Sequence, residues 1–439
     1  MRSLYITHVG MIEPLGQSQV MPYLVGLARR GADIEILSYE MAGTPADAID
    51  ALRGRFDRER IRWSPTFRSP AHGLGRKVLE SAMGAARGLA LALARRPDIV
   101  HARSYLPAAV ADVIATTVPR AKLLFDCRGM IGDEYVDGGH WTRDRLEYRL
   151  VKAYERRLFR RADGIVVLTR ALERWLRDQA VLGAHSEMAV IPCCADLEKF
   201  RPDPEVRAAS RAAVGVAADE LLVVYSGSLG NWYLAEEMVR FFAAVRARRP
   251  RARWLVLTPS DTSDLEAHAA RAGVPRESLV FRRAPPAEMP SLLAAGDIGL
   301  SFIQSCFSKT GSSPTKVAEY LASGLPAVLN GDIGDQRDLA SERECAVVLR
   351  SYSTEDLATA AEHAILLAER PHAERAAAAV AGATRHFSLE DIGVPRYEAI
   401  YRALAGSAAR DGARGGRGTT GATNGAGLAG GSRMTVSEV

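Results

Sequence analysis

The chain has 439 residues, 47% of them hydrophobic and 25% charged, so it can bury two cores of ordinary domain size. Its formal charge of +5 is small for this length, and no basic block is interleaved with aromatic residues, which argues against a nucleic-acid partner. The five cysteines are scattered without a CxxC pair, and no apolar run is long enough to span a bilayer. We therefore expect a cytoplasmic protein that is soluble or peripheral at the inner face of the membrane.

Short apolar runs alternate with amphipathic stretches along most of the chain, which is typical of βαβ units on parallel sheets. In the first half these runs are 4–9, 34–38, 99–102, 123–126, 164–168 and 188–192. In the second half they are 221–226, 254–258, 279–281, 298–302, 327–330 and 346–349. The pattern predicts an α/β protein with two facing Rossmann-like, doubly wound domains and a cleft between them.

The predicted join between the domains is a polar segment bracketed by Pro192 and Pro202. This join divides the chain into domains 1–192 and 193–386, followed by a helix over 387–406. Residues 407–439 are rich in glycine and poor in large apolar side chains, so we expect them to form a disordered tail.

The strongest functional signal is the segment around Pro314, which is well placed to open a helix that Ser312 or Ser313 caps. Such a helix start presents free N–H groups and a partial positive charge, and it favours a diphosphate. Lys316 adds a full charge there, and Glu319 lies one turn on, where a carboxylate can accept both hydroxyls of a ribose. The alternative is an ordinary capped helix with a surface Lys–Glu pair.

Two glycine-bearing loops follow strands and precede helices. Gly227 and Ser228 follow the first strand of the second half, and Gly16 and Gln17 follow the first strand of the chain. Glycines at such positions allow close approach to phosphate, although ordinary tight turns have the same composition. Neither loop carries GxGxxG, which argues against a hydride-transferring dehydrogenase.

Taken together, these segments resemble the family 4 retaining glycosyltransferases of the GT-B fold, from about Leu4 to Leu404. Four stretches carry the resemblance. They are the glycine loop 7–18, the "PDIVHAR" strand 97–103, the crossover 190–202 and the donor-type helix 313–326, which is similar to that of surface-polysaccharide enzymes. Residues 387–404 resemble the helix that crosses back onto the first domain.

The resemblance implies an acceptor-side N-terminal domain and a C-terminal domain that binds a nucleotide-diphosphate sugar. It implies retaining transfer to a sugar or lipid-linked acceptor, in polysaccharide or glycoconjugate synthesis, with no cofactor and no essential metal ion. The donor-binding residues are then Gly16, Gln17, Gly227, Ser228, Ser313, Pro314, Thr315, Lys316 and Glu319. The residues predicted to be catalytic are Lys316, Glu319, Arg128 and Asp126.

The sequence departs from the family pattern in three places. Gly311 stands where members often have a glutamate, and Arg128 stands where they have a histidine. In the loop after the first strand of the second half, many members have an arginine and a lysine, where this chain has Ser228 and Trp232 or Tyr233. Phosphate neutralisation then depends on Lys316, with Lys309, Arg282 or Arg283 as helpers. Asp126 and Arg128 end a strand and are our candidates for contacts to the transferred sugar, together with Asp133 and Glu134. The alternative for these four is a loop held by a local Arg–Asp pair.

The stretch 143–161 is basic and amphipathic, so it either rests on anionic lipid or packs through its leucines as a solvated helix. Two other functions remain open on the same scaffold. One is a nucleotide-sugar epimerase or hydrolase, and the other is a non-catalytic sugar-nucleotide-binding partner, which the missing glutamate at Gly311 favours.

Overall fold

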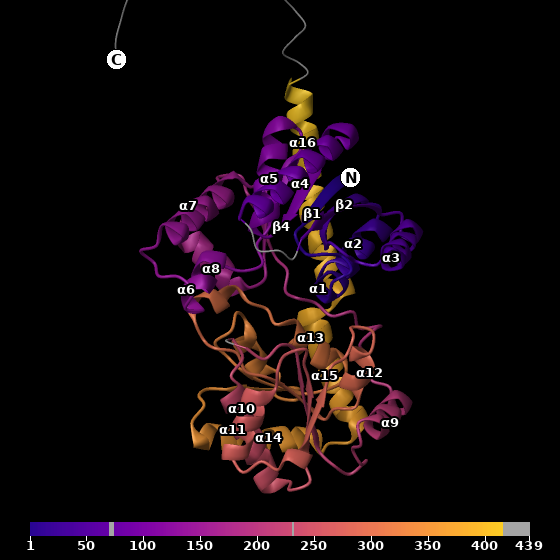
Figure 1. Cartoon of the computed structure of the whole chain (residues 1–439), viewed down its shortest axis with the longest axis vertical. Coiled ribbons are helices and arrows are strands. Elements are labelled where there is room, and N and C mark those ends of the chain that lie inside the picture. The colour runs from indigo at the N-terminus through magenta and orange to yellow at the C-terminus, as the bar shows by residue number, and fades with distance from the viewer. Residues whose placement is uncertain (70–73, 231, 416–439) are drawn as a thin grey trace, which may run out of the picture.

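The computed structural model describes residues 1–69, 74–230 and 232–415, and it consists of two α/β domains stacked end to end (Figure 1). Each domain is built on one parallel sheet with helices on both faces. Alternate residues of a strand enter opposite cores, as the pleat requires. In β1 (Arg2–Thr7), Leu4 and Ile6 pack into one hydrophobic cluster, whereas Tyr5 packs into the other.

The N-terminal sheet has seven strands in the order β3-β2-β1-β4-β5-β6-β7. The strand order reverses between β1 and β4, and ligands of open α/β sheets bind at the carboxyl ends of strands beside such a switch point. The strands after β1 are β2 (Asp33–Met41), β3 (Arg62–Arg68), β4 (Ile99–Arg103), β5 (Lys122–Asp126), β6 (Gly164–Val167) and β7 (Glu187–Val190). The helices are α1 (Pro14–Gln19), α2 (Met21–Arg29), α3 (Ala46–Arg58), α4 (Leu74–Arg95), α5 (Tyr105–Thr117), α6 (Ile131–Asp137), α7 (Leu146–Arg161) and α8 (Arg170–Asp178).

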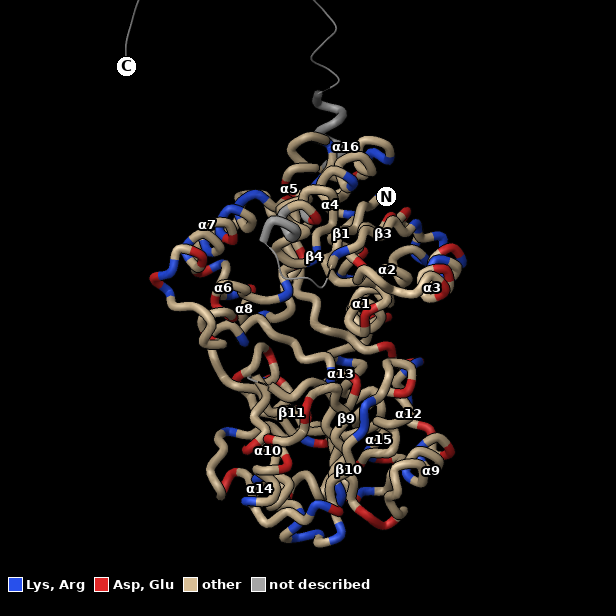
Figure 2. Tube along the Cα trace, viewed as in Figure 1, with Lys and Arg blue, Asp and Glu red and all other residues tan. Residues whose placement is uncertain are grey.

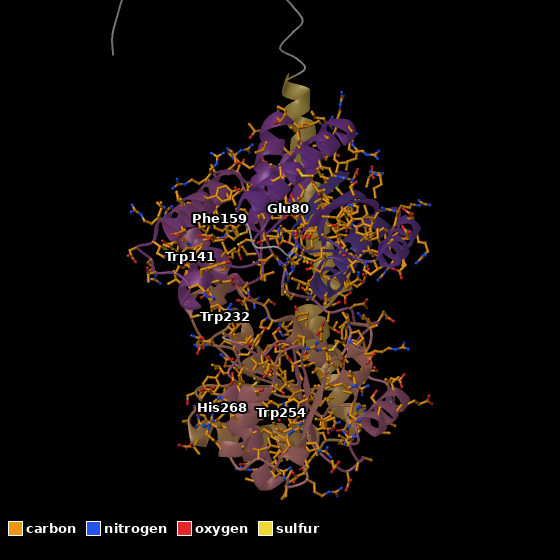
Figure 3. All side chains as sticks on the ribbon, in the orientation of Figure 1. Glu80, Trp141, Phe159, Trp232, Trp254 and His268 are labelled. Atoms are coloured by element: carbon orange, nitrogen blue, oxygen red, sulfur yellow. The ribbon has the colours of Figure 1, made fainter. Side chains whose placement is uncertain are left out.

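The C-terminal sheet has six strands in the order β10-β9-β8-β11-β12-β13, with its own switch point between β8 and β11. The strands are β8 (Leu222–Ser226), β9 (Arg253–Leu257), β10 (Leu279–Arg282), β11 (Ile298–Ser301), β12 (Ala327–Asn330) and β13 (Ala346–Leu349). The α-helices are α9 (Pro204–Ala213), α10 (Ala235–Arg248), α11 (Ser263–Arg271), α12 (Met289–Ala294), α13 (Thr315–Ala322), α14 (Thr354–Ala368) and α15 (His372–Phe387). Short 3-10 turns are η1 (Arg276–Ser278), η2 (Phe307–Gly311) and η3 (Gln336–Ser341). Trp254 of β9 is fully buried in the core of this domain (Figure 3).

The chain crosses between the domains twice, and the two crossings are hydrogen-bonded to each other. Ala195 N donates to Phe387 O at 2.8 Å, and Leu389 N donates to Ala195 O at 3.0 Å. After the π-helical turn η4 (Leu389–Gly393), α16 (Val394–Gly415) returns to the N-terminal domain (Figure 1). Its Tyr397 and Tyr401 are buried in that domain's core, so the last helix completes the first domain.

Two features differ from the sequence-based expectation. The edge strand β3 was not predicted, because Pro65 and two arginines interrupt its apolar pattern, and an edge position tolerates the proline. In addition, α16 continues past Ser407, the predicted start of the tail, as far as Gly415. Alanines at 408 and 409 are good helix formers and favour this extension. The remainder of the predicted tail, 416–439, lies outside the described residues. None of the described helices has the length and apolarity needed to traverse a bilayer.

Candidate active site

The helix α13 starts at the carboxyl end of the C-terminal sheet, in the part of that domain nearest α1 (Figure 1). Pro314 occupies its N-cap position, and no side chain caps the helix. The predicted cap by Ser312 or Ser313 is therefore wrong. Ser313 Oγ instead accepts a hydrogen bond from Cys193 N in the crossover, at 3.1 Å. The first N–H groups of α13 consequently have no side-chain acceptor and can bind an anion.

Lys316 projects from the first turn of α13 into a buried aromatic niche. The residue is only 8% exposed, and its Nζ lies 4.1 Å from the ring centroid of Tyr225 and 4.1 Å from that of Tyr233. Among the described residues, no hydrogen-bond acceptor reaches the amine. Burial lowers the pKa of Lys316 to about 7, although Glu319 partly opposes this effect. Two ring faces stabilise the cation without satisfying its N–H donors.

The loop after β8 is shaped around this lysine. Gly227 has φ 125°, and a Cβ at this position would stand 2.9 Å from Lys316 Nζ. Ser228 contributes its backbone O, which accepts from the Tyr225 hydroxyl at 2.5 Å. The structure thus brings the predicted residues Gly227 and Lys316 together. It also adds Tyr225 and Tyr233, which sequence reasoning missed because aromatic residues near a strand are ordinary core residues.

Glu319 lies one turn after Lys316, as the sequence predicted. Burial raises the pKa of this carboxyl to about 7, while the positive charges of Lys199 and Lys316 pull it down. Lys199 comes from the crossover between the domains and is exposed. Its proximity to Glu319 could not be read from the sequence. Two neighbouring groups whose pKa values are both shifted toward 7 by burial are typical of a functional site.

Gly16 and Gln17 lie in α1, which faces the C-terminal domain from the lower edge of the N-terminal domain (Figure 1). A Cβ on Gly16 would stand 2.2 Å from Gly10 O, so only glycine permits this packing. Gln17 Nε2 donates to Met11 O at 2.5 Å. Both residues therefore fix the shape of the loop before α1, and contact with donor phosphates stays a prediction for each.

Asp126 and Arg128 lie at the end of β5 but are engaged within the protein. Asp126 is 1% exposed, accepts from Tyr397 Oη at 3.0 Å and lies 3.4 Å from Arg128. Burial would raise the pKa of Asp126, but Arg128 and His101 outweigh it and hold that pKa well below its usual range. Arg128 also donates to Cys193 Sγ at 3.3 Å. The local Arg–Asp pair weighed as an alternative is thus present, and a direct contact of either residue with sugar stays a prediction.

Asp133 and Glu134, the other candidates in this loop, are also paired. Asp133 is buried against Lys152 Nζ at 2.8 Å. Glu134 reaches across the domain junction to Lys309 Nζ at 3.5 Å, and the same amine lies 3.8 Å from the ring centroid of Trp232 (Figure 3). Lys309 was predicted to help with phosphate, but here it joins α6 to η2. Arg283 of the same predicted group donates to Pro259 O.

Gly311 occupies the position where the resemblance leads us to expect a glutamate. A Cβ there would stand 2.9 Å from Leu172 Cδ2 of α8. The space beside Gly311 is therefore filled by the N-terminal domain, and a larger residue would require the Leu172 side chain to shift.

The two facing doubly wound domains, with the helix start of one domain opposite the glycine loop of the other, define the GT-B fold and confirm the predicted fold class. Residues 16–194 match the family model described as "Glycosyl transferase 4-like domain". No curated protein sequence matches the chain at a significant level.

Solved structures resemble the chain over nearly its whole length. Sucrose-phosphate synthase from Thermosynechococcus elongatus has a TM-score of 0.68 at 15% identity, covering 92% of this chain and 99% of that one. HepE of Anabaena in complex with UDP-glucose has a TM-score of 0.67 at 16% identity, with 92% and 100% covered. WaaG, a glycosyltransferase of lipopolysaccharide biosynthesis, has a TM-score of 0.61 at 16% identity, with 87% and 95% covered. The family model and the shared fold together support a glycosyltransferase.

Proposed function

We propose that the protein moves a sugar from a nucleotide-diphosphate sugar onto an acceptor hydroxyl. The observation that carries this proposal is the buried Lys316 amine at the uncapped start of α13, for which the described part of the chain supplies no acceptor. A diphosphate supplies the missing acceptors for the amine and for the helix N–H groups together. Glu319, one turn away, holds the ribose hydroxyls. HepE, which was solved in complex with UDP-glucose, supports this class of donor for the fold.

The difficult step of such a transfer is departure of the nucleoside diphosphate from the anomeric carbon. Negative charge then accumulates on the leaving phosphate, and preorganised positive groups stabilise it best when they are shielded from water. Lys316 and the first turn of α13 have this arrangement. The N-terminal domain holds the acceptor hydroxyl in line with the sugar.

The stereochemical course that we propose is retention. In front-face attack the leaving phosphate accepts the proton of the acceptor hydroxyl, so no protein base is required, and the family resemblance favours this route. We place the reaction in the synthesis of cell-surface polysaccharide or glycoconjugate. The anomeric configuration of the first-formed product, followed by NMR, tests the course, and an inverted product would contradict it.

The donor is tested by thermal denaturation of the full chain with a panel of nucleotide sugars. We expect one donor to raise the melting temperature, because a ligand that binds only the folded state stabilises it. Lys316→Met should reduce this shift. Equal shifts of the melting temperature in the parent protein and in Lys316→Met, or no shift with any donor, would contradict the assignment of the site.

A non-catalytic partner of a transferase is the second candidate, and the packing of Leu172 against Gly311 favours it, since it closes the position of the usual glutamate. This candidate predicts donor binding without turnover. An epimerase or hydrolase predicts conversion of the donor in the absence of acceptor. Donor consumption measured with and without acceptor separates all three functions.

We propose that transfer requires no cofactor and no resident metal ion, because Lys316 and the helix start supply the positive charge. Within the described residues, no group of three His, Cys, Asp or Glu side chains is placed to hold a metal ion. Activity that disappears after treatment with a chelator and returns with a divalent ion would contradict this proposal.

We also propose that α7 brings the protein to an anionic membrane surface in the cytoplasm, where a lipid-linked acceptor would lie. The leucines of this helix are divided, because Leu158 is buried whereas Leu146 and Leu150 are 65% and 60% exposed. Exposed arginines at 145 and 149 accompany them (Figure 2). Co-sedimentation with anionic vesicles should be lost in Leu146→Glu/Leu150→Glu. The control is Leu366→Glu, at a 58% exposed leucine of α14, and equal losses would contradict the role of α7.

A further inference from the structure

Four aromatic rings form a run across the domain junction. In the N-terminal domain, Tyr135 and Trp141 are stacked with their ring centroids 4.3 Å apart, and the ring of His140 lies 5.9 Å from that of Tyr135. Trp232 of the C-terminal domain approaches the same loop, because a Cβ on Gly138 would stand 3.2 Å from Trp232 Cζ2 and 3.4 Å from His140 Cδ2. We call these four aromatic residues the aromatic run, and Figure 3 shows its two tryptophans, one in each domain.

The N-terminal part of the aromatic run is held in place by the backbone. After α6 the chain turns back, so that the N–H groups of His140 and Trp141 both donate to Tyr135 O, at 2.9 and 3.0 Å. Gly139 makes this return possible with a φ of 74°, which glycine adopts without strain. The three rings are therefore positioned before any ligand arrives.

The C-terminal end of the aromatic run adjoins the proposed donor site. Trp232 lies in the loop after β8, and the next residue is Tyr233, whose ring centroid lies 4.1 Å from Lys316 Nζ. The ring of Trp232 itself packs on Lys309, with Nζ 3.8 Å from the ring centroid. The run thus begins one residue from the aromatic niche of Lys316 and continues over the end of α6.

The rings are accessible to a ligand. Tyr135 is 42% exposed, His140 is also exposed, and Trp141 and Trp232 are half-buried. Apolar surface that is gathered in one exposed place marks a binding surface more often than single exposed residues do. Tyrosine and tryptophan also combine a flat apolar face with a polar group at the rim, so they suit a ligand that is both apolar and hydroxylated.

A pyranose ring has this combination. One of its faces presents C–H bonds with a partial positive charge, which the negative face of an aromatic ring attracts, while its hydroxyls stay at the edge. An anionic bilayer fits less well, because Trp232 is recessed between Gly138 and Lys309. In addition, α6 carries three acidic residues and no basic one, and they are Asp133, Glu134 and Asp137.

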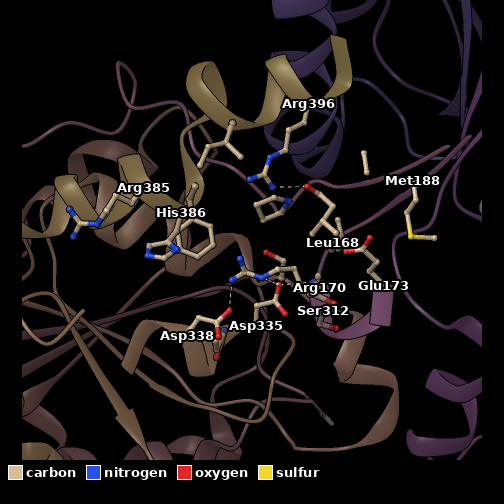
Figure 4. Close-up of a pocket in the computed structure, with 18 of the residues that line it drawn as sticks. Leu168, Arg170, Glu173, Met188, Ser312, Asp335, Asp338, Arg385, His386 and Arg396 are labelled. Atoms are coloured by element: carbon tan, nitrogen blue, oxygen red, sulfur yellow. Dashed lines mark hydrogen bonds and ion pairs between the residues drawn. The ribbon is translucent and has the colours of Figure 1, made fainter. Parts of the chain in front are cut away.

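The aromatic run is separate from a cavity of about 540 Å³ that lies at the same junction, between β7, α8, η3 and α16 (Figure 4). That cavity shares Ser313 and Pro314 with the proposed donor site, and its Arg170 is paired with Asp335 and Asp338. None of the four rings lines it. The aromatic run is therefore a surface of its own at the edge of the junction.

We propose that the aromatic run is an outer acceptor subsite, which binds a pyranose unit of a saccharide acceptor at a distance from the reacting hydroxyl. This inference rests on the proposed transferase function and narrows the acceptor to a carbohydrate. Because both domains supply rings, a bound saccharide favours the domain arrangement described here over a more open one.

The test is saturation-transfer-difference NMR of the full chain with a panel of disaccharides of glucose, galactose and mannose. We expect at least one disaccharide to bind saturably, with the strongest transfer to the C–H protons on one face of a pyranose ring. Sorbitol is the control ligand, because it has similar hydroxyls but no ring face. It should give no saturable transfer.

The variants remove one ring in each domain. Tyr135→Leu and Trp232→Leu should each weaken disaccharide binding about three- to tenfold, the usual contribution of one aromatic contact. Tyr135→Phe keeps the ring and should bind like the parent protein. Phe67→Leu is the matched control, because Phe67 of β3 is 47% exposed and does not belong to the aromatic run.

Absent saturable binding, equal transfer to sorbitol, or unchanged affinity in both leucine variants would overturn the proposal. Loss of anionic vesicle binding in Tyr135→Leu, with disaccharide binding unchanged, would also overturn it and would assign the rings to a membrane surface. The melting-temperature shift caused by a nucleotide sugar should persist in Tyr135→Leu. Failure of this subsite is therefore distinguishable from failure of the proposed donor site, which would remove that shift from the parent protein.

Discussion

The two domains present their charged groups to the junction in opposite ways. In the N-terminal domain, Asp126 and Asp133 are buried and fully partnered by residues of the protein. In the C-terminal domain, Lys316 is also buried, but its amine has no acceptor among residues 1–69, 74–230 and 232–415. A satisfied charge holds the fold together, whereas an unsatisfied one is available to a ligand. This difference supports our proposal that the C-terminal domain provides the charge for binding the donor, opposite a rigid surface of the N-terminal domain.

Asp126→Ala tests the N-terminal half of this comparison and should have the largest effect. It leaves Arg128 without its partner and removes the acceptor of Tyr397, so unfolding in urea should become easier by about 3–5 kcal/mol. Asp57→Ala, at an exposed position of α3, should stay within about 0.5 kcal/mol. If Asp126→Ala kept its stability but lost transfer, the carboxylate would act on the sugar, as the sequence predicted.

Lys316→Met tests the C-terminal half. Methionine fills the space without the charge, so kcat should fall by about 10²–10³-fold, as for other preorganised groups that stabilise a leaving oxyanion. The melting temperature should be unchanged or higher. For comparison, Lys309→Met disturbs the contact with Glu134 but leaves α13 intact. It should lower kcat by less than tenfold, which corresponds to less than about 1.4 kcal/mol. Similar losses in both variants would mean that the two lysines share the phosphate.

Glu319→Gln should have a smaller effect, confined to nucleotide binding. Loss of charge-assisted hydrogen bonds to the ribose should weaken nucleoside diphosphate binding by about tenfold to a hundredfold. The matched ligand is a 2′-deoxy nucleoside diphosphate. The difference in its affinity between the parent protein and Glu319→Gln should be smaller. An equal difference with the deoxy nucleotide would place the ribose away from Glu319.

The pH dependence of nucleotide affinity should show the smallest effect and sharpens the assignment of both groups. The pKa of Lys316 is lowered to about 7, so its positive charge is lost as the pH rises above 7. The pKa of Glu319 is raised to about 7, so its negative charge is lost as the pH falls below 7. Affinity should therefore peak near neutrality and fall on each side by at most about tenfold per pH unit. Lys316→Met should flatten the alkaline side and Glu319→Gln the acid side, and a flat profile in the parent protein would contradict both assignments.

Much of the fold could be predicted from local sequence patterns, because buried parallel strands are short apolar runs. Five strands of the N-terminal sheet and all six of the C-terminal sheet follow predicted runs closely, and the first run matches β1 with a small shift. The exception is β3, where an edge position removes the need for continuous apolar residues. The helix start near Pro314 was also predictable, because proline and the change of periodicity mark it locally.

The partners of the site residues could not be predicted in the same way. Asp126 accepts a hydrogen bond from Tyr397, which lies 271 positions further along the chain. Glu134 accepts one from Lys309 of the other domain. Such contacts depend on how the two sheets and α16 are arranged, which no local pattern encodes. This is why the sequence could place Lys316 and Glu319 in one helix, where their role in the site stays a prediction, but did not reveal that Asp126 and Asp133 are paired with basic residues.

The return of α16 to the N-terminal domain has a consequence for how the protein is made. Tyr397 and Tyr401 of α16 fill the core of the N-terminal domain, whose last strand, β7, ends at Val190. A ribosome must therefore synthesise the entire second domain before the first can complete its interior. A truncated chain that ends near residue 192 would expose the groove that these tyrosines fill, so it should aggregate, and adding residues 388–415 as a separate peptide should restore its solubility.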